Sequence, residues 1–120
     1  MVSDLMAVSR LGKFYGCGVE FSLDLLGGKW KTVILARLKE EPLRYGELRR
    51  LIPGLSDKVL SERLQGLCEA GLVEPVTGEE PKRYRLTCRG ESLRPLLQAL
   101  YDWGEASATE MGVHIRHAGD

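Results

Sequence analysis

The sequence predicts a mainly helical α+β domain with one small β-hairpin, and three observations support this class. A short helical pattern at 45–52 is broken by Pro53 and Gly54, and a longer helical pattern opens at Ser56. A hairpin pattern with a basic second strand follows at 72–86. Further helical patterns lie on both sides. Together these elements indicate a winged helix-turn-helix with extra N- and C-terminal helices, a fold that presents one helix to the DNA major groove.

Composition places the chain among ordinary single-domain globular proteins. It has 120 residues, of which 43% are hydrophobic and 28% are charged. No apolar run is long enough to cross a membrane and no export signal opens the chain, so we expect a cytoplasmic, nucleoid-associated protein with no membrane partner. The three cysteines, Cys17, Cys68 and Cys88, are then expected to be reduced thiols and not disulfides.

The formal net charge is zero, with 17 basic and 17 acidic residues, and this counts against nucleic-acid binding. The objection weakens if the charges are segregated. Basic residues gather at the short helical pattern and in the second strand of the hairpin, whereas many acidic residues lie elsewhere. We therefore expect a basic face with a modest affinity for DNA of any sequence. The basic positions are Arg44, Arg49, Arg50, Lys82, Arg83 and Arg85.

Two helices are expected before the helix-turn-helix. The first runs from Val19 to Leu26 and is stopped by a Gly-Gly pair. The second runs from Lys29 to about Lys39 and shows the apolar stripe of a helix with one buried face. Residues before the first helix show weak periodicity, which predicts a mobile segment. The chain is thus divided into a flexible N-terminal arm at 1–16, a DNA-binding domain at 17–112 and a disordered tail at 113–120.

The two central helices have clear boundary residues. The first begins at Tyr45 and cannot continue through Pro53-Gly54, because proline lacks the N–H and glycine allows a sharp turn. Ser56 is a good N-cap for the second helix, since its hydroxyl can accept a free backbone N–H of the first turn. Gly71 is expected to end that helix.

The hairpin and a last helix complete the domain. The expected strands are 72–76 and 82–86, and Pro75 restricts the first of them to a sheet edge or a strand end. Thr87 can cap the last helix, which we expect to bend at Pro95.

An apolar stripe runs along this last helix. Such a stripe is more often core than interface. Here it lies outside the compact helix-turn-helix unit, and we therefore favour a dimer seam. The stripe consists of Leu93, Leu97, Leu100 and Tyr101.

In this fold the helix that opens at Ser56 is the recognition helix. Its exposed side chains either contact DNA or form only a solvated face. Lys58 and Gln65 are the stronger candidates for base contact. Asp57 and Glu62 would repel phosphate, so they either read a cytosine amino group or lie out of contact. The candidate contacts on this helix are Ser56, Lys58, Ser61, Glu62 and Gln65.

The basic residues outside this helix are candidates for contacts to the DNA backbone. Arg49 and Arg50 lie beside the glycine-containing turn, where they either grip phosphates or serve as solubilising charges. Along the second strand Arg83 and Arg85 share a face and Lys82 points away. This strand is either a wing that contacts a phosphate or the minor groove, or a basic edge that discourages strand pairing.

Seven segments of the chain carry recognisable motifs: Cys17–Glu20, Leu26–Trp30, Arg44–Arg50, Pro53–Ser56, Gly71–Val73, Tyr84–Gly90 and Asp102–Gly104. In this order and spacing they resemble the HxlR family of bacterial and archaeal winged-helix regulators. The resemblance covers roughly 17–104 and implies a homodimer built by the N- and C-terminal helices on a palindromic operator. Two features depart from the family pattern: Gly18 replaces a proline, and Pro75 stands in a slightly short hairpin where the family often has arginine.

Cys17 is the candidate sensor, because some members of the family respond to oxidation or alkylation of a thiol in this position. Sensing would require an exposed thiol with a lowered pKa, for which a helix N-terminus or Lys13 is a candidate cause. The alternative is a packed or merely tolerated thiol. Cys68 is expected in the core, and Cys88 is compatible with either role.

No enzyme, cofactor or metal site is expected. The sequence has no nucleophile–base arrangement and no glycine-rich phosphate loop, and its one ligand-like spacing is His114-x-x-His117 in the tail. We therefore predict a homodimeric regulator that binds double-stranded operator DNA, with an oxidant or a small molecule as a candidate effector. The alternative is a winged-helix module that binds another protein, which zero net charge and acidic residues in the recognition helix favour.

Overall fold

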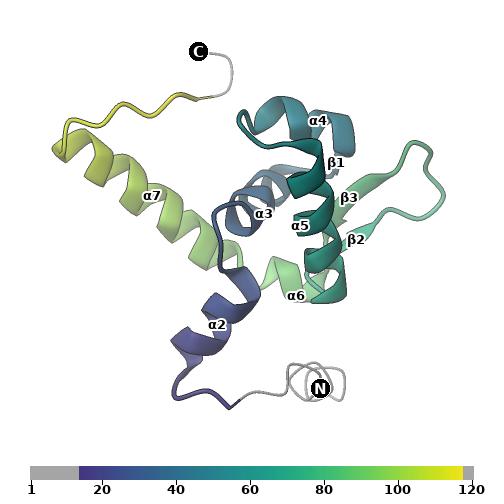
Figure 1. Cartoon of the computed structure of the whole chain (residues 1–120), viewed down its shortest axis with the longest axis horizontal. Helices are drawn as coiled ribbons and strands as arrows, with labels where there is room; N and C mark the ends of the chain where they lie inside the picture. The colour runs from purple at the N-terminus through teal and green to yellow at the C-terminus, as the bar shows by residue number, and fades with distance from the viewer. Residues whose placement is uncertain (1–13, 118–120) are drawn as a thin grey trace.

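The computed structural model describes residues 14–117 and shows a helical body with a three-stranded antiparallel sheet (Figure 1). Residues 1–13 of the predicted arm at 1–16 and residues 118–120 of the predicted tail lie outside the described residues. None of the helices in the described part of the chain is long and apolar enough to cross a membrane. The elements are α2 (Gly18–Leu26), α3 (Lys31–Glu40), β1 (Leu43–Arg44), α4 (Tyr45–Leu51), α5 (Asp57–Glu69), β2 (Val73–Pro75), β3 (Arg83–Leu86), α6 (Cys88–Glu91) and α7 (Arg94–Glu110).

The helix-turn-helix consists of α4 and α5. Gly54 takes a φ of 87° in the turn between them, a conformation that disfavours a side chain. The N-cap expected at Ser56 is confirmed, since its hydroxyl accepts the N–H of Val59 at 3.2 Å. At the other end of α5, Gly71 has a φ of 76° and the N–H of Leu72 reaches back to the carbonyl of Leu67 at 3.0 Å. Both ends of the expected recognition helix are therefore fixed by local contacts.

The hairpin of β2 and β3 is the wing, and β3 is the central strand of the sheet. Val73 lies opposite Leu86 on one side, and Arg44 of β1 lies opposite Arg83 on the other. The strand β1 has only two residues and was not predicted from the sequence. It ties the start of α4 to the wing, so the wing has a fixed place beside the helix-turn-helix.

The last helical segment differs from the prediction of one helix bent at Pro95. It forms two helices, α6 and α7, with a break at Ser92 and Leu93. Pro95 lies in the first turn of α7, where the N–H that it lacks would have no partner inside the helix. The expected cap at Thr87 is confirmed, since its hydroxyl accepts the N–H of Gly90 at 3.0 Å.

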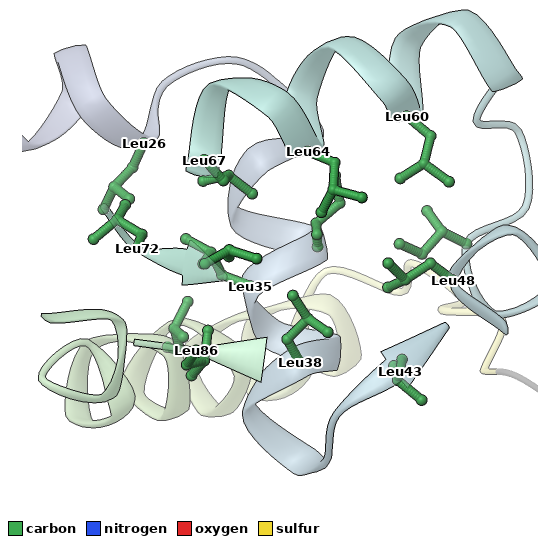
Figure 2. Packing of buried hydrophobic residues seen from close by; sticks show 14 of the residues in the cluster. Leu26, Leu35, Leu38, Leu43, Leu48, Leu60, Leu64, Leu67, Leu72 and Leu86 are labelled. Carbon is green, nitrogen blue, oxygen red and sulfur yellow. The ribbon is translucent and has the colours of Figure 1, made fainter. Parts of the chain in front are cut away.

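The core is built almost entirely of leucine around α3 (Figure 2). This helix packs against α4, α5, β3 and α7. Figure 2 shows Leu60, Leu64 and Leu67 of α5 on the side of that helix that faces the core. The opposite face of α5 is consequently left to solvent. The buried residues are Leu26, Ile34, Leu35, Leu38, Leu43, Leu48, Ile52, Leu55, Leu60, Leu64, Leu67, Leu72, Val73, Leu86 and Leu97.

Candidate nucleic-acid interface

The exposed face of α5 is the centre of the candidate interface. All five positions predicted from the sequence are exposed: Ser56, Lys58, Ser61, Glu62 and Gln65. A helix of 13 residues with one face packed on the core and the other polar has the form that a major groove admits. The face is not uniformly basic, because Asp57, Glu62 and Glu69 share it with one cation, Lys58.

A polar network joins α4 to the start of α5. The hydroxyl of Tyr45 lies 3.0 Å from the carbonyl oxygen of Asp57, 3.2 Å from Asp57 Oδ1 and 3.2 Å from Ser61 Oγ. Arg49 Nε donates to Asp57 Oδ1 at 2.7 Å, and its Nη1 donates to the carbonyl of Leu55. These contacts set the position of α5 relative to α4. Arg49, Asp57 and Ser61 therefore already have partners within the protein.

The remaining polar side chains of α5 differ in whether they already have a partner within the protein. Gln65 Nε2 donates to Glu69 Oε2 at 3.2 Å, so its amide faces along the helix. Within the described chain the side chains of Lys58 and Glu62 make no hydrogen bond or ion pair, and both residues are exposed. Lys58 is consequently the cation of α5 that is most available to an external anion.

A groove of about 430 Å³ lies between α4 and the wing. Arg44 and Arg50 line it from the helix side, and Lys82 lines it from the wing. Glu47 and Glu80 also line it, and Glu47 accepts the backbone N–H of Arg44 at 2.7 Å. The groove thus carries three cations and two carboxylates beside the helix-turn-helix, which gives it a small excess of positive charge.

The two arginines of β3 are paired with acids of the wing itself. Arg83 donates to Glu79 through Nε at 2.7 Å and through Nη2 at 2.6 Å, and Arg85 Nε donates to Glu74 at 2.9 Å. The hydrogen bond from Arg83 holds the pKa of the Glu79 carboxyl below its usual value, so this carboxylate is charged at neutral pH. The acid partners were not predicted. The spacing of Glu79 and Arg83 across the turn is the sequence signal that could have indicated them.

The four residues of the predicted dimer stripe differ in how far they are buried. Leu97 is 1% exposed and belongs to the core of the domain, so assigning it to a dimer seam was wrong. Leu93 is partly buried and packs against that core. By contrast, Leu100 and Tyr101 are 48% and 56% exposed. Leu97 is the residue of α7 that is buried in the core, and α7 packs against α3.

Other large apolar side chains are exposed on the two outer helices. Val19 and Leu23 of α2 are exposed, as are Leu96 and Trp103 of α7. Both helices extend from the side of the molecule opposite the wing (Figure 1). An apolar surface of this kind is typical of a face that contacts another protein.

The cysteines occupy three different environments. Cys17 is exposed and forms the N-cap of α2. Burial raises the pKa of the Cys68 thiol, which packs partly against the core as expected. Cys88 is exposed at the start of α6. Lys13, one of the two candidate groups for activating Cys17, lies outside the described residues.

The tail histidines do not assemble a metal site. His117 Nε2 contacts the carboxylate of Glu105 at 3.1 Å. Among residues 14–117 no group of three metal-ligating side chains comes together.

Comparisons with known proteins agree with this architecture. The model of the HxlR-like helix-turn-helix family matches residues 25–111. A relative from Methanothermobacter thermautotrophicus, described as an uncharacterized HTH-type transcriptional regulator, is 38% identical over 109 residues, which cover 88% of this chain and 80% of the relative.

Two solved structures are similar in fold and sequence. The redox regulator HypR in its reduced form has a TM-score of 0.72 and 30% identity, over 80% of this chain and 98% of that one. The quinone-bound YodB from B. subtilis has a TM-score of 0.63 and 32% identity, over 73% of this chain and 96% of that one. The predicted fold and family are confirmed, and so is the prediction of a regulator instead of an enzyme. The chain belongs to the HxlR-like helix-turn-helix family and is a transcriptional regulator of the winged helix-turn-helix type.

Proposed function

We propose that the protein binds a palindromic operator as a homodimer, with α5 of each subunit in the major groove of one half-site. The observation that carries this proposal is the polar face of α5, which the leucines on its other face and the Tyr45 network hold outward in one position. Lys58 and Gln65 are proposed to contact bases. Ser56, Ser61 and Glu62 lie on the same face and are proposed to line the groove.

The groove between α4 and the wing supports the proposed contacts to the DNA backbone. Arg44, Arg50 and Lys82 converge there and would meet phosphates beside the base-reading helix. Arg49 and Arg85 are proposed to add to the same positive field while they remain paired with Asp57 and Glu74. Because so many cations have acidic neighbours, the affinity for random DNA is expected to be modest.

The apolar residues of α2 and α7 support a homodimer. Leu100 and Tyr101 are proposed as seam residues, together with other exposed apolar side chains of these helices. A twofold axis between the α7 helices would present two α5 helices to one face of the DNA. Half-sites are then expected one helical turn apart, or a multiple of it.

A thiol response through Cys17 is proposed as the regulation of this activity. Its support is the exposure of Cys17 at the start of α2, one of the helices of the proposed dimer seam. The similar proteins HypR and YodB are described as a redox regulator and as a quinone-bound protein. A covalent change at Cys17 would act on the dimer seam and so on the spacing of the two α5 helices. A small-molecule effector in place of an oxidant is the alternative signal.

A mobility-shift assay on the DNA upstream of the protein's own coding region, at ~0.1 M salt, tests the proposal. We expect a shift that unlabelled random DNA competes away only weakly. A complex with no preference over random DNA would favour the alternative function, a winged-helix module for protein binding, which the neutral charge of the chain supports.

The same assay after treatment with a mild thiol oxidant tests the sensor. The wild type is expected to change its affinity, and Cys17→Ser is expected to keep it. Cys88→Ser is the matched control, because Cys88 is also exposed but lies in α6. If the oxidant does not change the DNA affinity of the wild type, the redox proposal is wrong.

A further inference from the structure

Two arginines stand opposite each other on neighbouring strands where the wing joins the helix-turn-helix. Arg44 of β1 and Arg83 of β3 are cross-strand partners in the sheet, so their side chains leave the same face. Like charges directly opposite in a sheet repel each other. A sheet that places two guanidinium groups together in this way creates a site for a bridging anion.

In the structure that anion is a carboxylate of the protein itself. Glu79 accepts two hydrogen bonds from Arg83, at 2.7 and 2.6 Å, and its Oε1 lies 3.9 Å from Arg44 Nη2. The geometry toward Arg83 is bidentate, the arrangement in which guanidinium also binds phosphate. Glu79 therefore occupies the place that a phosphate oxygen pair would take.

The position of Glu79 allows it to be displaced. It lies in the loop between β2 and β3, beside Gly78, and this loop extends away from the helices (Figure 1). The side chains of the three residues are between 26% and 44% exposed, so solvent and an external anion can reach them. Arg44 also lines the groove that contains Arg50 and Lys82, which connects this site to the proposed path of the DNA backbone.

We propose that Arg44 and Arg83 form a phosphate-binding site that Glu79 fills in the free protein, and that a DNA backbone phosphate replaces the Glu79 carboxylate on binding. This inference rests on the proposed function, since it requires DNA beside the wing. Glu79 then acts as an internal competitor that lowers the affinity for DNA of any sequence. The competition leaves the base contacts of α5 unchanged, so it raises the proportion of binding that depends on sequence.

The test compares Glu79→Gln with Glu80→Gln in binding to the upstream DNA and to a random duplex. Both variants lose one negative charge, at adjacent positions. Glu80 lines the groove as well but makes no ion pair among the described residues, so Glu80→Gln measures the effect of removing a charge from the groove without freeing Arg83. We expect Glu79→Gln to bind the random duplex about two- to fivefold more tightly than the wild type, the range of an exposed ion pair. Glu80→Gln is expected to change the affinity less, and the gain should shrink as salt is raised.

Arg83→Ala in both backgrounds shows whether the gain passes through this arginine. It is expected to weaken binding more in the Glu79→Gln protein than in the wild type. Equal affinities of Glu79→Gln and wild type, or an equal gain in Glu80→Gln, would overturn the inference. Thermal unfolding of each variant shows whether a change in DNA affinity comes from a damaged wing. Glu79→Ala is a second variant, in which no side-chain amide can replace the carboxylate as a partner of Arg83.

Two further outcomes are distinguishable. If the wild type binds neither duplex under any salt condition, the proposed function itself fails, whereas a wild type that binds DNA isolates the question of Glu79. Inorganic phosphate is titrated into Glu79→Gln at the phosphate concentration of the duplex. If inorganic phosphate bound as tightly as the duplex, this result would overturn the assignment of the site to the DNA backbone.

Discussion

At the scale of single residues, the side chains of the proposed interface differ in how free they are to contact DNA. Lys58 is exposed and unpaired within the described chain, and Arg50 is exposed beside the groove. Gln65 must give up its hydrogen bond to Glu69 before its amide can meet a base edge. These differences assign separate roles to polar side chains that the sequence alone does not distinguish.

Replacing Lys58 or Gln65 by alanine should change which DNA sequence is preferred, with a loss of about 1–3 kcal/mol at the affected base pair. Arg50→Ala should weaken binding to all sequences and reduce the slope of log affinity against log salt by about one. Titrations of specific and random duplexes at several salt concentrations measure both effects. Equal losses on the two duplexes for all three variants would contradict the assignment of base contacts.

Contacts within one turn of the chain were predictable at this scale, and contacts across the fold were not. The caps at Ser56 and Thr87 follow from the chemistry of a hydroxyl before a helix, and both are observed. The pairing of Arg49 with Asp57 depends on the angle between α4 and α5, which no local pattern specifies. For the same reason no local pattern indicated that the Tyr45 hydroxyl bonds to Ser61.

At the scale of elements, the position of the recognition helix depends on its polar connection to α4. Tyr45→Phe removes a hydroxyl that contacts three atoms of α5 and should lower the free energy of unfolding by about 1 kcal/mol. Denaturant unfolding measures the loss. The matched control is Tyr84→Phe, because the Tyr84 hydroxyl makes no hydrogen bond within the described chain. If the two variants were equally stable, the network would not hold the helices together.

Helices with a clear apolar period were predicted to within about two residues, whereas short elements were not. The strand β1 has two residues, too few for any alternation to show, and it exists because β3 offers it a partner. One helix with a bend at Pro95 was predicted because proline is the visible signal. In the structure the helix restarts before Pro95, and the proline is accommodated in its first turn.

At the scale of the whole molecule, α2 and α7 leave apolar side chains in solvent that a second copy would cover. Leu100→Lys should shift the protein from a dimer of about twice 13.4 kDa toward a monomer, because a charge would be buried in the seam. Sedimentation equilibrium measures the mass. Thr77→Lys, which adds the same charge at the exposed tip of the wing, is the control and should remain dimeric. A dimer of unchanged stability in Leu100→Lys would exclude this seam.

The sequence indicated that the outer helices carry more apolar side chains than the core needs. It did not indicate which of these side chains are buried in the core and which remain exposed. Leu97 and Leu100 lie close together on one helix, yet Leu97 packs into the body near α3 and Leu100 faces solvent. That division is set by the tertiary placement of α7. For the DNA surface the situation is similar, since the wing arginines looked free until their acid partners were located.

The central claim is that two copies of α5 read two half-sites of one operator. Hydroxyl-radical footprinting of the upstream DNA tests this most directly. We predict two protected patches with twofold symmetry, one helical turn apart or a multiple of it, on one face of the duplex. A single protected patch, or cleavage that the protein leaves unchanged at concentrations where it shifts the DNA, would contradict the claim.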